Sequence, residues 1–308
     1  MFGCLIALAV LRQPGEPRVP RCRSRRQHRQ RRHHLLRAFR LATQQETSRR
    51  DWQDVGLERQ MHTLLQRYSR GEHVEVWADL TALGNQVRRE PILHDALGVT
   101  RETMRRVRHN LELLVPRLHD FGFAFGAGFL DDYSSEEAQE VMRHAPILGA
   151  PAPNVLEQIA ELEALTGTLP MSLRGWYELV GTVNLIGMKP DWPRGRLPHG
   201  LDPLFVYAIE TAIEMVREYS EMGVWQQDPV LSLAPDEFHK YGISGLGSYG
   251  LQLPDEAADA LLLHEWHGTT FMNYVRIALH WAGMPGLEAS SALPSDDLRY
   301  LTDGFLPL

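Results

Sequence analysis

The sequence has 308 residues, of which 44% are hydrophobic and 8% aromatic, and this composition is typical of a globular protein with a sizeable buried core. The apolar opening, residues 2–11, is too short to span a bilayer, and no run of 18 or more apolar residues occurs, which argues against a membrane-spanning helix. Cys4 and Cys22 are the only cysteines, so residues 51–308 cannot hold a disulfide, a thiolate zinc site or a cysteine nucleophile.

Charge is distributed unevenly along the chain. Residues 1–50 hold 13 arginines and two acidic side chains, a net charge of +11; since the whole chain carries −7, residues 51–308 carry −18. An acidic body repels nucleic-acid phosphate and attracts basic surfaces. We therefore expect a protein partner with a basic surface, and nucleic-acid binding only through residues 12–50. Lysine occurs only at Lys189 and Lys240, against 30 arginines, which indicates a GC-rich coding sequence.

Residues 1–50 are predicted to form a disordered basic tail, because an arginine-rich tract with few apolar residues cannot bury a core. Two interpretations are open: a tail that binds nucleic acid or an anionic surface, and a non-native extension upstream of a start at Met61. The apolar opening has no basic residue before it and no small-residue cleavage site after it. This disfavours a secretory signal and favours a cytoplasmic protein.

Residues 51–150 are predicted to form a mostly helical region, because apolar residues recur there at helical spacing. The clearest helix is expected to begin at Thr100 as N-cap and to end at Gly122, with Pro116 kinking or dividing it. Two shorter elements follow. They are a strand over the alternating aromatic residues at 123, 125 and 129, and a helix opened by the capping box at 134–137.

Residues 154–288 are predicted to form an α+β domain in which a mixed β-sheet packs against helices. Helices and strands come in mixed order without a regular βαβ alternation, which favours α+β over a doubly wound sheet. Helices are expected at about 155–166, 171–180, 211–219 and 271–281, and strands at about 183–186, 204–209 and 229–233. Residues 289–308 are expected to form a loosely ordered tail.

The run LEQIAELEALTGTLPMSLRGWYELVGTVNLIG, residues 156–187, resembles the opening of the SUKH superfamily, named for a yeast cell-wall regulator and its bacterial relatives. In that family a helix leads through Leu-Pro into a second helix with an aromatic residue, then a glycine turn and a strand. Three further segments, 202–204, 233–235 and 271–286, resemble uncharacterised bacterial proteins of the same group. The chain departs from the family at 181–184, where Gly-Thr-Val-Asn replaces the usual Asn-Gly turn.

The resemblance implies a non-enzymatic protein-binding module, and in its most specific form an immunity protein that neutralises a bacterial toxin. It carries over no catalytic, cofactor-binding or metal-binding residue. We therefore predict no catalytic, cofactor-binding or metal-binding site, and we expect a protein-binding interface instead. Four aromatic residues lie in Pro/Gly-rich loops, where burial is not expected, and are our candidate interface anchors: Trp192, Trp225, Tyr241 and Tyr249.

Two motifs support alternative functions less well. His264-Glu265-Trp266-His267 would suit a small metal-dependent hydrolase, but the helical zinc motif needs its histidines at i and i+4, and here they stand at i and i+3. The run 245–250 fits G-x-G-x-x-G, but Pro254 follows where a helix is required, so we expect a turn-rich surface loop. A nucleic-acid-associated protein acting through the basic tail is the remaining alternative.

Overall fold

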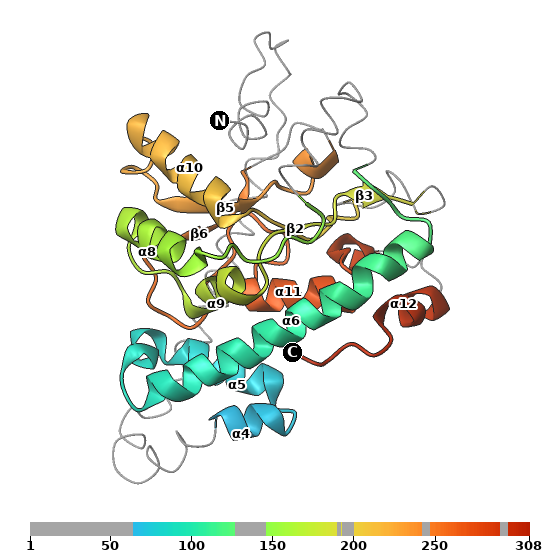
Figure 1. The fold of residues 1–308 in the computed structure, drawn as a ribbon, viewed down its shortest axis with the longest axis horizontal. Coiled ribbons are helices and arrows are strands. Elements are labelled where there is room, and N and C mark those ends of the chain that lie inside the picture. The colour runs from blue at the N-terminus through green and yellow to red at the C-terminus, as the bar shows by residue number, and fades with distance from the viewer. Residues whose placement is uncertain (1–63, 127–145, 190–191, 193–199, 242–246, 290–294) are drawn as a thin grey trace, which may run out of the picture.

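The computed structural model of the protein describes residues 64–126, 146–189, 192, 200–241, 247–289 and 295–308. The predictions for the basic tail, for residue 129 and for the capping box at 134–137 lie outside these residues. Helices predominate, and the strands are short (Figure 1).

The described chain opens with helices, as predicted for this region. They are α4 (Leu64–Ser69), α5 (His73–Ala82), the 3₁₀ helix η1 (Gly84–Arg88) and α6 (Ile92–Asp120). The helix α6 starts earlier than we predicted, because Thr100 is not its N-cap. Thr100 is a buried interior residue whose hydroxyl donates a hydrogen bond of 2.9 Å to the carbonyl of Ala96. A threonine hydroxyl can bond the preceding turn in this way as readily as it can cap a helix.

We predicted that Pro116 would kink or divide this helix. The helix is not divided, since α6 continues through Pro116 to Asp120. Proline removes one backbone hydrogen bond from a helix. Leu114 and Leu118, on either side of Pro116, are both fully buried. Their packing against the core keeps the turn helical where the sequence alone favours an interruption.

The helices α8 (Val155–Thr166) and α9 (Met171–Leu179) form where the sequence predicts them. Trp176 of α9 is fully buried, and its indole N–H donates a 2.7 Å hydrogen bond to the carbonyl of Gly181. Gly175 faces α6 so closely that a Cβ there would lie 2.6 Å from Cγ2 of Thr100. The absence of a side chain at Gly175 therefore permits the close packing of α9 on α6.

The strands form three separate antiparallel pairs, and their mixture with helices confirms the α+β class. We expected a single mixed sheet, whereas in the described residues each pair has two strands. The pairs are β1 (Ala124–Phe125) with β3 (Gly187–Met188), β2 (Val183–Asn184) with β4 (Phe205–Val206), and β5 (Val230–Ala234) with β6 (Tyr249–Gln252).

The strand β6 corrects the expectation of a surface loop at the end of the G-x-G-x-x-G run. Tyr249, Gly250 and Leu251 are buried, and Gly250 pairs with Ser232 of β5. A Cβ at Gly250 would lie 2.7 Å from the carbonyl oxygen of Leu231. This glycine therefore serves the close approach of two strands, a role that spacing in the sequence does not distinguish from a turn.

The remaining helical segments are α10 (Ile209–Glu221), η2 (His239–Tyr241), α11 (Phe271–His280), η3 (Pro285–Ala289) and α12 (Ser295–Thr302). Residues 295–308 are not the loosely ordered tail that we expected. The backbone of Leu306 exchanges two 2.8 Å hydrogen bonds with the side chain of Asn110 on α6, and Arg117 donates to the carbonyl of Leu301. Side chains of α6 thus fix a segment whose own sequence carries weak signals of structure.

A single hydrophobic core joins the helical region to residues 154–288. Buried residues of α5, α6, α9 and α11 belong to one cluster, and Leu148 bridges to Val183 across the stretch between the two regions. In Figure 1 the long helix α6 crosses the molecule, with α4 and α5 below it and α9 and α11 above it. The two regions therefore pack as one body around α6.

Candidate binding surface

Three of the four aromatic residues that we predicted as interface anchors are buried, and this overturns the reason for choosing them. Trp192 packs against Phe121 and Phe123, with ring centroids 6.2 and 5.7 Å apart, and Trp225 and Tyr249 are also buried. The backbone of Tyr241 ends η2, and its side chain lies outside the described residues. The rings of Trp192, Trp225 and Tyr249 therefore belong to the core and not to an exposed surface.

Tyr249 belongs instead to a buried polar cluster centred on Lys240. The ammonium of Lys240 lies 2.5 Å from Oδ1 of Asp202, 3.4 Å from the hydroxyl of Tyr274 and 4.6 Å from the ring centroid of Tyr249. The hydroxyl of Tyr249 donates a 3.0 Å hydrogen bond to Glu237. Asp202, Lys240, Tyr249 and Tyr274 are all essentially fully buried. The cluster ties together the chain before β4, the segment η2, the strand β6 and the helix α11.

The surroundings of Asp202 raise its affinity for a proton. Burial raises the pKa of Asp202 to about 6, Lys240 acts in the opposite direction, and the carboxylates of Glu265 and Glu237 add to the rise. Asp202 also has a backbone φ of 48°, in the left-handed region that non-glycine residues seldom adopt. Burial likewise raises the pKa of both Tyr249 and Tyr274 above 10, so their hydroxyls stay neutral.

The cluster acts chemically as an internal tie, because its charged groups face one another within the interior. A buried ion pair loses hydration that its mutual attraction only partly restores, and its best-attested use is to select one packing arrangement over others. The sequence held a signal for this site. Lys240 is one of two lysines in an arginine-rich chain, a rarity that coding bias alone also explains.

The motif His264–His267 is also held by partners within the protein. The ring of His267 is bonded through Nδ1 to Glu265 and through Nε2, at 2.8 Å, to Glu288. Burial alone would lower the pKa of His267, but the hydrogen bonds and charges of Glu265 and Glu288 raise it above its usual value. His264, with a φ of 67°, packs its ring against Gly247 instead. Within the described residues, no three His, Cys, Asp or Glu side chains are grouped so as to hold a metal ion.

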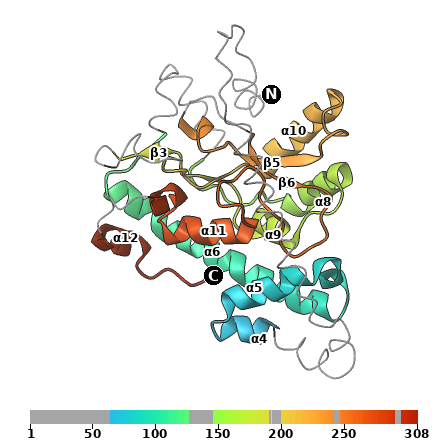
Figure 2. The same ribbon diagram turned by 180° about the vertical axis from the view of Figure 1, so that it is seen from behind.

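The helices α8 and α10 form the surface with the strongest features of a binding face. Both views show them side by side on one flank, next to β5 and β6 (Figures 1 and 2). Gln158 donates to Glu210 at 2.7 Å, and Arg217 donates to Glu161 at 2.5 Å. Later residues of α8 meet later residues of α10, so the two helices run parallel and their C-terminal ends lie at the same end of the flank.

We name this surface the α8–α10 face. The two helices carry seven acidic side chains and one arginine. Eight large apolar side chains are exposed in the described part of the chain, and half of them belong to these helices or to the turn after α10. Those four are Leu156, Leu165, Met222 and Val224. Leu165, Met222 and Val224 lie at the C-terminal ends of the helices, where the helix dipoles add negative potential.

Fold and surface together define an acidic α+β protein with a two-helix face that exposes apolar side chains. The chain matches no known family model, no curated protein and no solved structure. None of its described helices is both long enough and apolar enough to cross a membrane; even α6, with 29 residues, is too polar.

Proposed function

We propose that the protein is a non-enzymatic binding module that recognises a basic protein through the α8–α10 face. The observation that carries this proposal is the exposure of Leu165, Met222 and Val224 at one end of a strongly acidic helix pair. Interfaces combine apolar anchors, which bury most of the energetically important area, with a polar rim that sets orientation and rate. The α8–α10 face has both the exposed apolar side chains and the acidic side chains for such a rim.

Charge supports the choice of a basic partner. The net charge of −18 on residues 51–308 attracts a basic surface from a distance, and Glu214 and Glu221 stand exposed on the face itself. Such electrostatic steering raises the association rate and weakens as salt is added. The proposed binding surface is the α8–α10 face, because the side chains of Trp192, Trp225 and Tyr249 are buried.

In its most specific form, the proposal is that the protein is a cytoplasmic immunity protein of the SUKH type and that its partner is a toxin. What supports this form is the order of elements from 155 to 184: the helix α8, Leu169-Pro170, the helix α9 with Trp176, the turn at Gly181 and the strand β2. An immunity protein is expected to be encoded beside its toxin, so the reading frames next to this gene supply the candidate partner.

The test measures the affinity of the full chain for the product of the neighbouring reading frame, together with the salt dependence of that affinity. We expect Met222→Arg and Glu214→Lys each to weaken binding about tenfold or more, because the first places a charge among the apolar anchors and the second reverses a rim charge. Leu261→Arg and Glu75→Lys are matched controls at exposed positions on other parts of the molecule. They are expected to leave the affinity unchanged.

Two outcomes would contradict the proposal in different ways. If the neighbouring product does not bind, the toxin-immunity form is wrong, whereas the α8–α10 face can still be tested with any partner identified later. If it binds and the variants on the face behave like the controls, the face is wrong. Measured helix content and unfolding free energy of each variant separate a loss of binding from a loss of folding.

A further inference from the structure

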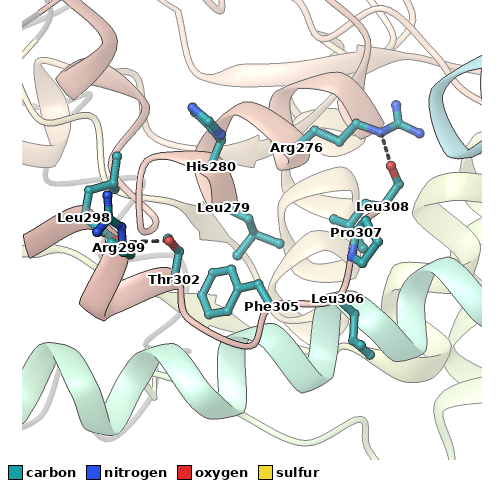
Figure 3. A pocket seen from close by; sticks show the side chains of 10 residues that line it. All are labelled: Arg276, Leu279, His280, Leu298, Arg299, Thr302, Phe305, Leu306, Pro307 and Leu308. Atoms are coloured by element: carbon teal, nitrogen blue, oxygen red, sulfur yellow. Dashed lines mark hydrogen bonds between the residues drawn. The ribbon is translucent and has the colours of Figure 1, made fainter. Parts of the chain in front are cut away.

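A cavity of about 640 Å³, widely open to solvent, lies between α11, α12 and the C-terminal segment 305–308. Figure 3 shows side chains from these three elements surrounding it. Sites for small molecules in proteins have volumes of about 300–1,000 Å³. In Figures 1 and 2 the helix α12 lies on the flank opposite α8 and α10, so the cavity is separate from the proposed binding face.

The inner wall of the cavity is apolar. Leu279 of α11 is buried, and Leu298 of α12 and Phe305 pack against the hydrophobic core while lining the cavity. Figure 3 shows the methyl groups of Leu279 and the ring of Phe305 turned toward one another. An apolar molecule placed here would cover side chains that the protein itself covers only in part.

The ionisable side chains that line the cavity are all basic: Arg276, His280 and Arg299. Such a lining is unexpected in a body with a net charge of −18. Arg276 is engaged within the protein, because it donates to the main-chain oxygen of Leu308 at 3.1 Å and to Oδ1 of Asn273 at 2.7 Å. It fixes the segment 305–308 as a wall of the cavity.

His280 and Arg299 remain at the rim for a ligand. Arg299 is 79% exposed and approaches Asp296, itself 87% exposed, at only 3.7 Å. Exposed ion pairs of this kind contribute little to the stability of the fold. Arg299 can therefore leave Asp296 and pair with a ligand anion instead. The ring of His280 is exposed and meets Trp281 edge-on at 5.3 Å.

We propose that this cavity binds an amphipathic small-molecule anion. Its apolar body lies against Leu279, Leu298 and Phe305, and its carboxylate or sulfonate faces His280 and Arg299. The apolar wall would set the affinity of such a ligand, and the basic groups at the rim would set its orientation. This inference does not depend on the proposed binding of a basic protein.

The test uses the full chain and anilinonaphthalenesulfonate, an aromatic anion whose fluorescence increases in apolar surroundings. We expect saturable binding to one site, displacement by decanoate, and much weaker displacement by decanol, which has the same apolar chain without the charge. Arg299→Glu is expected to weaken binding of the probe about tenfold, and Leu298→Trp to abolish it by filling the cavity.

The matched control is Arg105→Glu, since Arg105 is an exposed arginine of α6 that pairs with Glu102 of the same helix. It reverses the same charge away from the cavity and is expected to bind the probe as the native protein does. Arg299 is exposed, so its replacement leaves folding intact even if Leu298→Trp does not fold. Equal binding by Arg299→Glu and Arg105→Glu, or equal displacement by decanol and decanoate, would overturn the proposal.

Discussion

Asp202 and Lys240 form an ion pair in the interior, and the state of this pair depends on pH. Burial raises the pKa of Asp202 from 3.8 to about 6. Between these values the folded protein holds a proton on Asp202 that the unfolded chain has released. The contribution of Asp202 to stability is therefore fully present below about pH 4 and is lost as the pH rises through 6.

This dependence on pH can be tested with the variant Asp202→Asn, because the asparagine side chain does not titrate. The free energy of unfolding of the native protein, relative to this variant, should fall by up to about 3 kcal/mol from pH 4 to pH 7. Denaturant unfolding at several pH values measures this difference. Asp228→Asn, at an exposed position, should follow the native protein throughout. A difference that stays constant or grows with pH would show that Lys240 keeps Asp202 ionised.

At the level of secondary-structure elements, the packing of α9 on α6 outweighs helix propensity at Gly175. Alanine is a better helix former than glycine by about 1 kcal/mol, so helix propensity alone predicts that Gly175→Ala stabilises the protein. The structure predicts the opposite, because the added Cβ would lie 2.6 Å from Cγ2 of Thr100. We expect Gly175→Ala to lower the free energy of unfolding by about 1–3 kcal/mol.

A double-mutant cycle tests the cause of this loss. Thr100→Ser deletes the methyl group that Gly175→Ala would strike and keeps the hydroxyl that bonds Ala96. The combined variant should recover part of the stability, with a coupling energy above about 0.5 kcal/mol in chemical denaturation. Additive losses would mean that α6 and α9 move apart to accept the new side chain.

At the scale of the whole molecule, stability is expected to reside in residues 64–308. A shortened chain that starts at Met61 should therefore melt at the same temperature as the full chain, because residues 1–50 offer few apolar side chains to bury. Removal of residues 303–308 is the contrasting change. It deletes the hydrogen bonds of Leu306 with Asn110 and should lower the melting temperature. A clear drop for the Met61 chain would show that the basic segment packs on the protein.

The sequence by itself determined the α+β class and several of the helices. Apolar spacing together with stop signals such as Gly167 and Gly283 located α8, α9 and α11 to within a few residues. These signals are local, because helix periodicity and capping involve residues within a few positions of one another. The sequence also showed that this part of the chain is acidic. It did not show that α8 and α10 lie side by side and form one surface.

Only the tertiary structure decided which polar and aromatic residues are inside. Lys240 meets Asp202 across 38 positions of sequence, and Asn110 meets Leu306 across 196. Nothing local distinguishes an exposed tryptophan from one that packs against distant aromatic rings, as Trp192 does against Phe121 and Phe123. Burial depends on which distant segments pack together, and the hydrophobic effect that drives this packing is non-directional and leaves no period in the sequence.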